Sequence, residues 1–335
     1  MIVSDAPRTL PLASNLDLPL SVVTEKLAFL AQSGTGKSCA AMRVAELMLG
    51  AGAQVVALDP VGIWWSLRAS AGGDGPGFPI VVFGGDHGDL PLTPDAGAFT
   101  AGVIVERGIF VVLDVSEFTT AETKSFVGAF ADHFFQLKKR ARSPVHIFFE
   151  EAQTFAPQMP ERDETIMLNR VERLLKLGRN YGAGWSLISQ QPQSVNKKML
   201  NQAGTLVALR TIGRHERKTI AEWVADKATS EEDLDLQRLL PTLATGVAHV
   251  WSPSFLHMST TVHISRRATY DSSKIPAFGD ASPDPRQLAP VDVEALRADM
   301  ADAATAVAQD DPPALRGRIA ALEQQLRADG RSTAR

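Results

Sequence analysis

The chain has 335 residues, of which 44% are hydrophobic and 21% charged, and its formal net charge at pH 7 is −4. Length and composition allow one large or two smaller globular α/β domains, and the negative balance excludes a polybasic nucleic-acid binder, so any DNA contact needs a local basic surface. One cysteine permits no internal disulfide, and we find neither a membrane span nor a signal peptide, so we expect a cytoplasmic protein without membrane contact.

The first motif follows a proline-punctuated arm, residues 1–26, which we expect to form edge strands. Residues 27–30 predict a buried strand, and apolar residues at helical spacing predict a helix up to residue 49. The loop between them reads Ala31-Gln32-Ser33-Gly34-Thr35-Gly36-Lys37-Ser38, which fits the phosphate-binding pattern Gly-x-x-x-x-Gly-Lys-Ser/Thr except at Ala31. Alanine there requires a negative φ. The context of strand, loop and helix therefore predicts a nucleoside triphosphate site.

The chemistry expected of this loop follows from its residue types. Gly34 and Gly36 let backbone N–H groups turn toward phosphates, Lys37 reaches the β- and γ-phosphates, and Ser38 offers a hydroxyl to Mg²⁺. The predicted nucleotide-binding residues are Gln32, Ser33, Gly34, Thr35, Gly36, Lys37, Ser38 and Cys39.

The middle of the chain continues the α/β pattern, with predicted strands at 54–59, 80–83 and 109–114 and a predicted helix at 121–139. We interpret the basic residues 138–142 as a solvated helix end rather than a DNA-binding patch, because cations there complement the helix dipole.

A second motif begins at the next buried strand, residues 145–149, which runs directly into Glu150 and Glu151. A strand that delivers carboxylates to its C-terminal end is the second half of an ATPase site. We expect Glu150 to support the Mg²⁺ shell and Glu151 to orient or deprotonate the attacking water.

A third motif surrounds the strand predicted at 185–189. A helix at 164–177 ends in Gly178-Arg179-x-x-Gly182 before the strand, and Gln190 follows it, where it can sense the γ-phosphate or the attacking water. Further strands are predicted at 206–210, 246–251 and 260–264, with helices at 214–224 and 231–240. We place the P-loop ATPase domain at 27–267 and interpret 268–335, which is rich in Pro, Asp, Ala and Ser, as a linker and poorly ordered tail with a short coiled coil at 314–328.

Together these motifs resemble the HerA/FtsK superfamily of P-loop ATPases, which are ring-forming DNA translocases and packaging motors. The resemblance covers residues 20–265 and rests on the loop 31–38, on 148–153 (Phe-Phe-Glu-Glu-Ala-Gln), on 178–182 and on 189–192 (Ser-Gln-Gln-Pro). The last two, flanking one strand, separate this family from other P-loop proteins. Many members carry Arg where this chain has Gln191.

The resemblance implies a RecA/ASCE-like α/β fold, with a central mostly parallel sheet flanked by helices, and ATP and Mg²⁺ as cofactors. It implies that Lys37 and Ser38 bind phosphate and Mg²⁺, that Glu150 supports the metal and that Glu151 is the catalytic base. Gln190 would be the sensor, and Arg179 an arginine finger that reaches the nucleotide of a neighbouring subunit.

The implied mechanism is ATP hydrolysis between subunits of a homo-oligomeric ring, expected to be a hexamer, which pulls DNA through its pore without reading sequence. Lys197 and Lys198 are candidate DNA contacts, with ordinary surface lysines as the alternative. A partner nuclease or packaging protein is expected. Two other functions stay open: an ATPase that powers secretion or conjugation, and an ATP-dependent assembly switch that moves no DNA.

Overall fold

The computed structural model describes residues 9–227, 235–273 and 285–298. The chain divides into two compact units, Met1–Val291 and Asp292–Arg335. All the elements that follow belong to the first unit.

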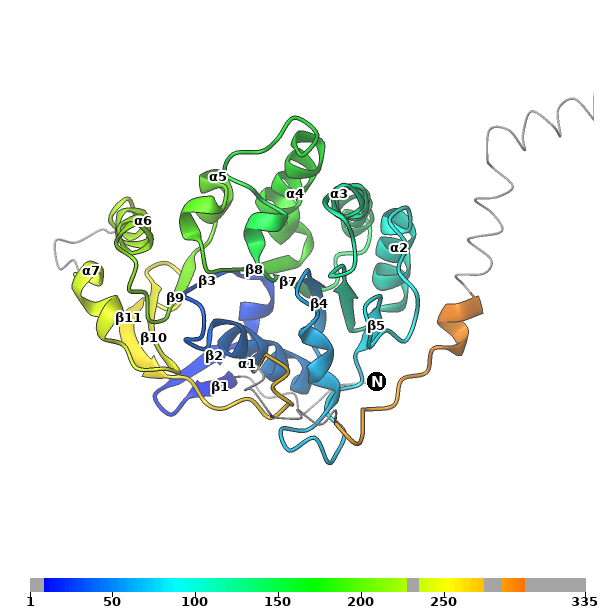
Figure 1. Ribbon diagram of the computed structural model, residues 1–335, viewed down its shortest axis with the longest axis horizontal. Coiled ribbons are helices and arrows are strands. Elements are labelled where there is room, and N and C mark those ends of the chain that lie inside the picture. Colours follow the sequence, from blue (N-terminus) through cyan, green and yellow to red (C-terminus); the bar gives the residue numbers. More distant parts are fainter. Residues whose placement is uncertain (1–8, 228–234, 274–284, 299–335) are drawn as a thin grey trace, which may run out of the picture. The chain divides into compact units, whose positions relative to one another are not determined.

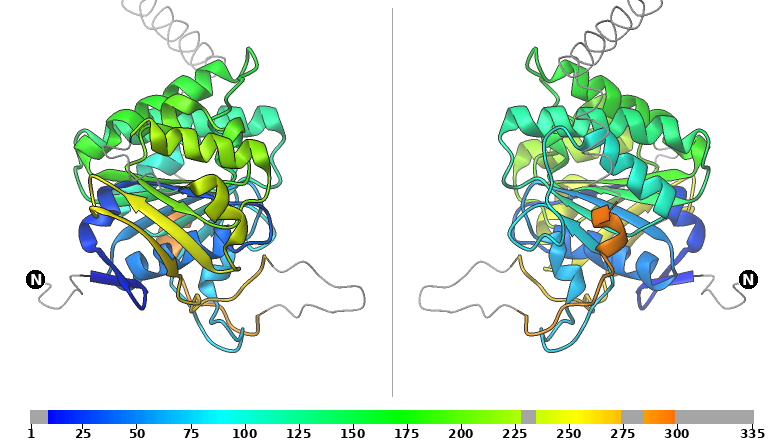
Figure 2. Two further views of the ribbon diagram at one scale, coloured as in Figure 1. Left: turned by 90° about the vertical axis from the view of Figure 1, so that its left-hand side faces the viewer. Right: turned by 90° about the vertical axis from the view of Figure 1, so that its right-hand side faces the viewer.

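A nine-stranded sheet forms the centre of the first unit, with the strand order β11-β10-β9-β3-β8-β7-β4-β6-β5 (Figure 1). The strands from β9 to β5 in this order are parallel, whereas β10 is antiparallel to both β9 and β11. Figure 2 shows the β10–β11 hairpin closing one edge of the sheet. The strand bounds are β3 Lys26–Leu30, β4 Gln54–Asp59, β5 Val81–Phe83, β6 Val111–Asp114, β7 Val145–Phe149, β8 Ala183–Ser189, β9 Thr205–Ala208, β10 Val247–Ser252 and β11 Met258–His263.

Helices cover both faces of this sheet. Figure 1 shows α2 to α6 along one face, and α1 on the other face together with a separate β-hairpin. The helices are α1 Lys37–Gly50, α2 Gly97–Arg107, α3 Thr120–Lys138, α4 Thr165–Leu177, α5 Lys197–Leu200, α6 Arg214–Ala225 and α7 Leu236–Leu239, and the hairpin pairs β1 Thr9–Ala13 with β2 Leu16–Pro19.

The central strands are buried on both faces because their residues are almost all apolar, as expected for a parallel sheet covered by two helical layers. Every residue of β4, β7 and β8 is buried. Local signals also fix helix ends: Thr119 and Glu122 form a reciprocal capping box at the start of α3. These rigid strands determine where the loops at their C-terminal ends lie.

The predicted fold class is confirmed, with a mostly parallel central sheet between helical layers. The predicted strands and helices agree with the observed ones to within a few residues, except that α2 and the short α5 were not predicted and that part of the helix expected at 231–240 lies outside the described residues. Within the predicted arm, the described residues 9–19 form the β1–β2 hairpin, which is separate from the central sheet. The coiled coil predicted at 314–328 lies outside the described residues. Within the described ranges, no helix combines the length and apolarity needed to cross a bilayer.

Candidate active site

The three sequence motifs meet because three neighbouring strands end at one edge of the sheet. β8 lies between β3 and β7 and is parallel to both. The phosphate-binding loop follows β3, the two carboxylates follow β7, and Gln190 follows β8. Since parallel strands place their carboxyl ends together, this edge is where an α/β protein binds its ligand.

The loop between β3 and α1 has the backbone conformation that its glycines allow. Gly34 and Gly36 have φ values of +73° and +95°, in the left-handed region. Ala31 is not among the residues with positive φ, as its side chain requires. The first backbone hydrogen bond of α1 runs from Ala40 N to Gly36 O, so the N–H groups of residues 37–39 have no acceptor within the helix. They are the donors that a helix N-terminus offers to phosphate.

Lys37 lies between the two carboxylates at the end of β7. Its Nζ is 2.9 Å from Glu150 Oε1 and 3.0 Å from Glu151 Oε1. Lys37 is 5% exposed and Glu150 1%, so the ammonium group and the first carboxylate interact in a largely water-free setting, where charge attraction is strong. The structure therefore brings together the predicted phosphate-binding lysine and both predicted carboxylates.

Glu151 is held in a strained and hydrogen-bonded position facing the cleft. Its φ is +45°, which costs a non-glycine residue about 1–2 kcal/mol. Gln153 Nε2 donates to Glu151 Oε2 at 2.8 Å, and Gln190 Nε2 donates to Oε1 at 2.5 Å. Partial burial would raise the pKa of Glu151, but the charge of Lys37 and the two amide hydrogen bonds outweigh it and lower that pKa. Glu151 is thus an ionised, oriented carboxylate.

Glu150 has a different environment, which suits a metal-supporting role. Ser38 Oγ donates to Glu150 Oε1 at 2.8 Å, so the two oxygen groups predicted to serve Mg²⁺ are in contact, and oxygen donors are those that Mg²⁺ prefers. The other oxygen, Oε2, accepts a hydrogen bond from the indole of Trp64 at 3.1 Å. Asp59, at the end of β4, holds the backbone of Trp64 in place, because its carboxylate accepts a 2.7 Å hydrogen bond from Trp64 N.

These groups line one cleft of about 930 Å³. This volume is at the upper end of the range of small-molecule sites, so the cleft has room for a nucleoside triphosphate. Its walls come from the phosphate-binding loop, the ends of β4 and β7, Gln190, Thr245 and three residues that follow the last strand, Asp271, Ser272 and Ser273.

Arg179 does not join this cluster. It lies in the short turn Gly178–Tyr181, which precedes β8, and so at the end of that strand opposite to Gln190. Its guanidinium forms an ion pair with Glu25, and 54% of its side chain is exposed. The arginine thus contacts a carboxylate of its own chain and also presents much of its side chain to the surface.

Lys197 and Lys198 lie in the first turn of α5, after Asn196, whose side chain caps that helix. Both side chains are exposed. They are therefore available to an external ligand.

Several residues of the cluster had no predicted role. Gln153 connects Glu151 to β8, because its Oε1 also accepts a 2.7 Å hydrogen bond from Ser189 Oγ. Its position two residues after Glu151 is a local signal from which a contact with that carboxylate could have been predicted. The large apolar ring of Trp64 by itself suggests core packing, and only the fold shows that its N–H reaches Glu150. No local pattern indicates that the segment near Asp271 returns to the cleft.

Comparisons with known proteins show what this chain is similar to. A family model described as the helicase HerA-like C-terminal domain matches residues 134–284. A probable helicase of Methanocaldococcus jannaschii is 31% identical over 138 residues, which cover 41% of this chain and 24% of the relative. The DNA double-strand break repair helicase HerA of Pyrococcus furiosus is 30% identical over 105 residues, 31% of this chain and 18% of the relative. The alignments thus span about a quarter or less of these relatives.

Among solved structures, the bacterial conjugative coupling protein TrwB superposes with a TM-score of 0.53 at 11% identity, covering 80% of this chain and 90% of that one. This similarity concerns the fold alone, which is that of a P-loop NTPase. The resemblance to the HerA/FtsK superfamily, predicted from the motifs, is confirmed by the family model and the relatives.

Proposed function

We propose that this HerA-like P-loop NTPase is the motor part of an ATP-driven DNA translocase. It would hydrolyse ATP between the subunits of a homo-oligomeric ring, a hexamer by analogy with the superfamily, in the cytoplasm. The observation that carries the proposal is Glu151, which faces the cleft, is held by Lys37, Gln153 and Gln190, and is kept ionised.

The residues at the cleft divide the chemistry among them. Lys37 and the N–H groups of the first turn of α1 would neutralise the β- and γ-phosphates. Mg²⁺, supported by Ser38 and Glu150, would supply charge stabilisation to the transferring phosphoryl group. Glu151 would orient and deprotonate the attacking water, and Gln190, bonded to the same carboxylate oxygen as Lys37, would report on the γ-phosphate.

Two further groups would act between molecules. We propose Arg179 as the arginine finger for a neighbouring subunit's ATP, since more than half of its side chain is exposed and it lies away from its own cleft. Lys197 and Lys198 would grip the DNA phosphate backbone without reading sequence. A nuclease or packaging protein would be the partner that uses the movement.

The test is the steady-state ATPase rate of the full chain with no DNA, with double-stranded and with single-stranded DNA. We expect DNA to stimulate the rate several-fold and Lys37→Ala to abolish turnover, because a methyl group cannot replace a charge at the phosphates. Lys197→Ala with Lys198→Ala should remove the stimulation while sparing the basal rate.

A matched control removes two cations elsewhere. Lys139 and Arg140 are exposed at the end of α3, and replacing both by alanine should leave stimulation intact. An active ATPase that ignores every DNA would exclude the translocase and favour the secretion ATPase or the assembly switch. Full turnover by Lys37→Ala would exclude the ATPase site itself.

A further inference from the structure

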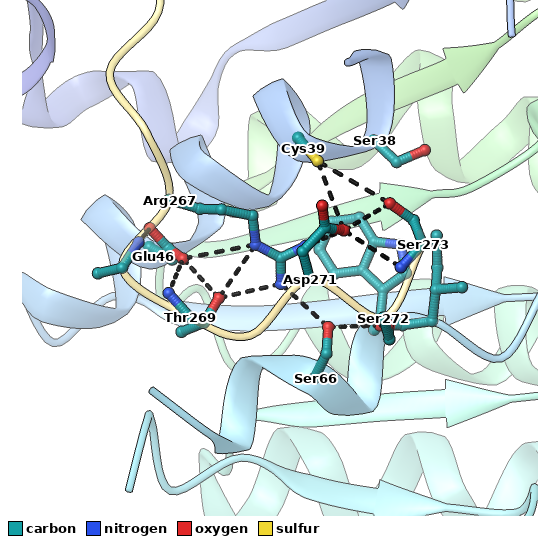
Figure 3. Close-up of polar contacts among 12 residues, drawn as sticks. Ser38, Cys39, Glu46, Ser66, Arg267, Thr269, Asp271, Ser272 and Ser273 are labelled. Carbon is teal, nitrogen blue, oxygen red and sulfur yellow. Dashed lines mark hydrogen bonds and ion pairs between the residues drawn. The ribbon is translucent and has the colours of Figure 1, made fainter. Parts of the chain in front are cut away.

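The chain returns to the phosphate-binding helix after its last strand. We call residues 265–273 the return segment; Figure 3 shows its polar contacts with α1. Its backbone is fastened to Glu46, in the third turn of α1: the N–H groups of Ala268 and Thr269 donate to the two carboxylate oxygens, each at 2.9 Å. Thr269 Oγ1 donates to the same carboxylate at 2.5 Å. The segment is thereby tied to the helix that carries Lys37.

This anchor is buried and charge-balanced. Glu46 is 2% exposed, and its carboxylate faces Arg43 at 3.0 Å and Arg267 at 3.9 Å. Arg267 Nη2 in turn donates to Ser66 Oγ at 2.9 Å. A buried carboxylate with cationic partners and three hydrogen bonds is costly to pull apart, so the segment has a defined position on α1.

From this anchor the segment runs to the first turn of α1 and forms one wall of the cleft. Glu46 and Cys39 are two helical turns apart, about 10 Å along the axis. Ser272 Oγ donates to Ile63 O at 2.8 Å, and Cys39 Sγ lies 3.9 Å from Asp271 Oδ1 and 4.0 Å from Ser273 Oγ. Asp271, Ser272 and Ser273 line the same cleft as Lys37 and Glu151.

The charge of Asp271 indicates which part of a nucleotide it faces. Lys37 points to the carboxylates of β7, and Cys39, two residues or about 200° further around the helix, points to the return segment. Asp271 therefore lies on the side of the helix N-terminus away from the γ-phosphate position. A carboxylate repels phosphate but accepts hydrogen bonds from the hydroxyl groups of a sugar.

We propose that Asp271 recognises the ribose of the bound nucleotide and makes the site selective for ribonucleotides over deoxynucleotides. This inference rests on the proposed nucleotide site. Acidic side chains bind ribose hydroxyls in the same way in dinucleotide-binding folds.

The carboxylate of Asp271 is oriented for this role. Ser273 donates to Oδ1 through its N–H at 3.1 Å and its hydroxyl at 2.6 Å, and Arg267 Nη1 lies 3.8 Å from the same oxygen. Among the described residues, all these contacts use Oδ1, which leaves Oδ2 for a ligand. Arg267 also offsets the negative charge that Asp271 brings near the phosphates.

The experiment compares the equilibrium binding of ATP, 2′-deoxyATP and 3′-deoxyATP to the wild-type chain, with Mg²⁺ present, by calorimetry. We expect at least one deoxy analogue to bind about tenfold or more weakly, because a site built to accept a hydroxyl loses a charged hydrogen bond without it. Asp271→Asn should weaken ATP binding about tenfold and bind all three nucleotides almost equally. Asp17→Asn, the same change on the exposed hairpin, should leave the preference unaltered.

Each result has a distinct meaning. Equal binding of the three nucleotides by the wild type, or an undiminished preference in Asp271→Asn, would overturn the ribose assignment while leaving the ATPase proposal in place. If the wild type binds no nucleotide at all, the proposed function fails instead. Asp271→Glu, which keeps the charge but moves it by one methylene, should also lose the preference and serves if Asp271→Asn does not fold.

Discussion

At the scale of single residues, the two adjacent glutamates show how one strand end can supply two different carboxylates. Glu150 is enclosed by Lys37, Ser38 and Trp64, whereas Glu151 is turned toward the cleft by its positive φ and bonded to two amides. The backbone turn between them, rather than their chemistry, gives the two side chains different surroundings.

This difference predicts that the same Glu→Gln substitution affects hydrolysis at one position and Mg²⁺ dependence at the other. Glu151→Gln should still bind Mg·ATP but hydrolyse it roughly 10²–10⁴-fold more slowly, because an amide cannot accept a proton from water. Glu150→Gln should mainly raise the Mg²⁺ concentration needed for half-maximal rate. Titrating Mg²⁺ in both variants, alongside ATP binding, checks this. A dispensable Glu151 with an essential Glu150 would show that the assignments are reversed.

A second residue-scale prediction concerns stability and pH. His146 is a fully buried residue of β7, and its ring nitrogens contact Val23 O at 2.9 Å and Ser186 Oγ, in β8, at 2.8 Å. Burial lowers the pKa of His146 to about 4, below the ~6.5 of an exposed histidine. Between these two values the unfolded chain binds the extra proton, so stability falls as pH decreases from about 6.5 toward 4.

The expected loss from His146 approaches about 3 kcal/mol at pH 4, and burial lowers the pKa of His249 to about 4 as well, which adds to the effect. Urea unfolding between pH 5 and 7 measures it. His146→Gln should flatten the pH dependence in this range even if it lowers stability throughout, whereas His133→Gln, on the exposed side of α3, controls for the substitution. An unchanged slope in His146→Gln would contradict the assignment.

At the scale of elements, β8 is the strand on which the site depends, because it is hydrogen-bonded to both β3 and β7. Its N-terminal half is pressed against the turn Leu20–Thr24. A Cβ built on Gly184 would lie 2.3 Å from Val23 O and 2.7 Å from two backbone atoms of Thr24. Glycine is therefore required there by close approach of two backbones.

We expect Gly184→Ala to destabilise the protein by about 1–3 kcal/mol, because backbone atoms have to move to admit the methyl group. Gly102→Ala is the matched control: it lies in α2 with no atom within 4 Å of the new Cβ, and should stabilise by about 0.5–1 kcal/mol. Thermal unfolding of both variants checks this. Equal melting temperatures for the two would exclude the close contact.

The elements also show what the sequence alone could and could not predict. The buried strands β3, β4, β7 and β8 and the motifs at their ends were predictable, because apolar runs and glycine spacing are local signals. Helix α2 was missed since it contains two glycines and no capping side chain, and Gly97 is needed only because α3 packs so closely that a Cβ would lie 2.3 Å from Phe126 O.

The position of the return segment was unpredictable because it depends on a contact with a distant part of the chain. Its polar, small residues suggest a linker, and their partner, Glu46, is more than 220 positions away in the chain. Likewise, the apolar pattern marks Trp64 as core but cannot show that its N–H meets Glu150. Contacts of this kind depend on which distant elements the fold places together, and no local pattern encodes them.

At the scale of the whole molecule, the assignment of Arg179 separates a ring motor from a monomeric ATPase. Arg179→Ala should bind ATP normally yet lose roughly 10³–10⁵ in rate if the arginine acts on a neighbour's nucleotide. Mixed with an excess of Glu151→Gln subunits, it should regain hydrolysis, because its intact site would then receive a neighbour's arginine. Activity and mass of the mixtures are measured together.

The ion pair with Glu25 provides the control. Glu25→Gln breaks the pair but keeps the arginine, so it should remain active if Arg179 serves catalysis. Equal loss of activity in Glu25→Gln and Arg179→Ala, with no rescue on mixing, would show instead that the pair is only structural.

The placement of Arg179 and Gln190 at opposite ends of β8 has a consequence for timing. The strand has seven residues, about 23 Å, and its ladders to β3 and β7 prevent it from sliding alone. In a ring of the proposed kind, a displacement felt by one subunit's Gln190 would shift the arginine offered to the next subunit. The rate at each site would then depend on the nucleotide state of the neighbouring subunit as well as on its own residues, so successive sites would fire in order.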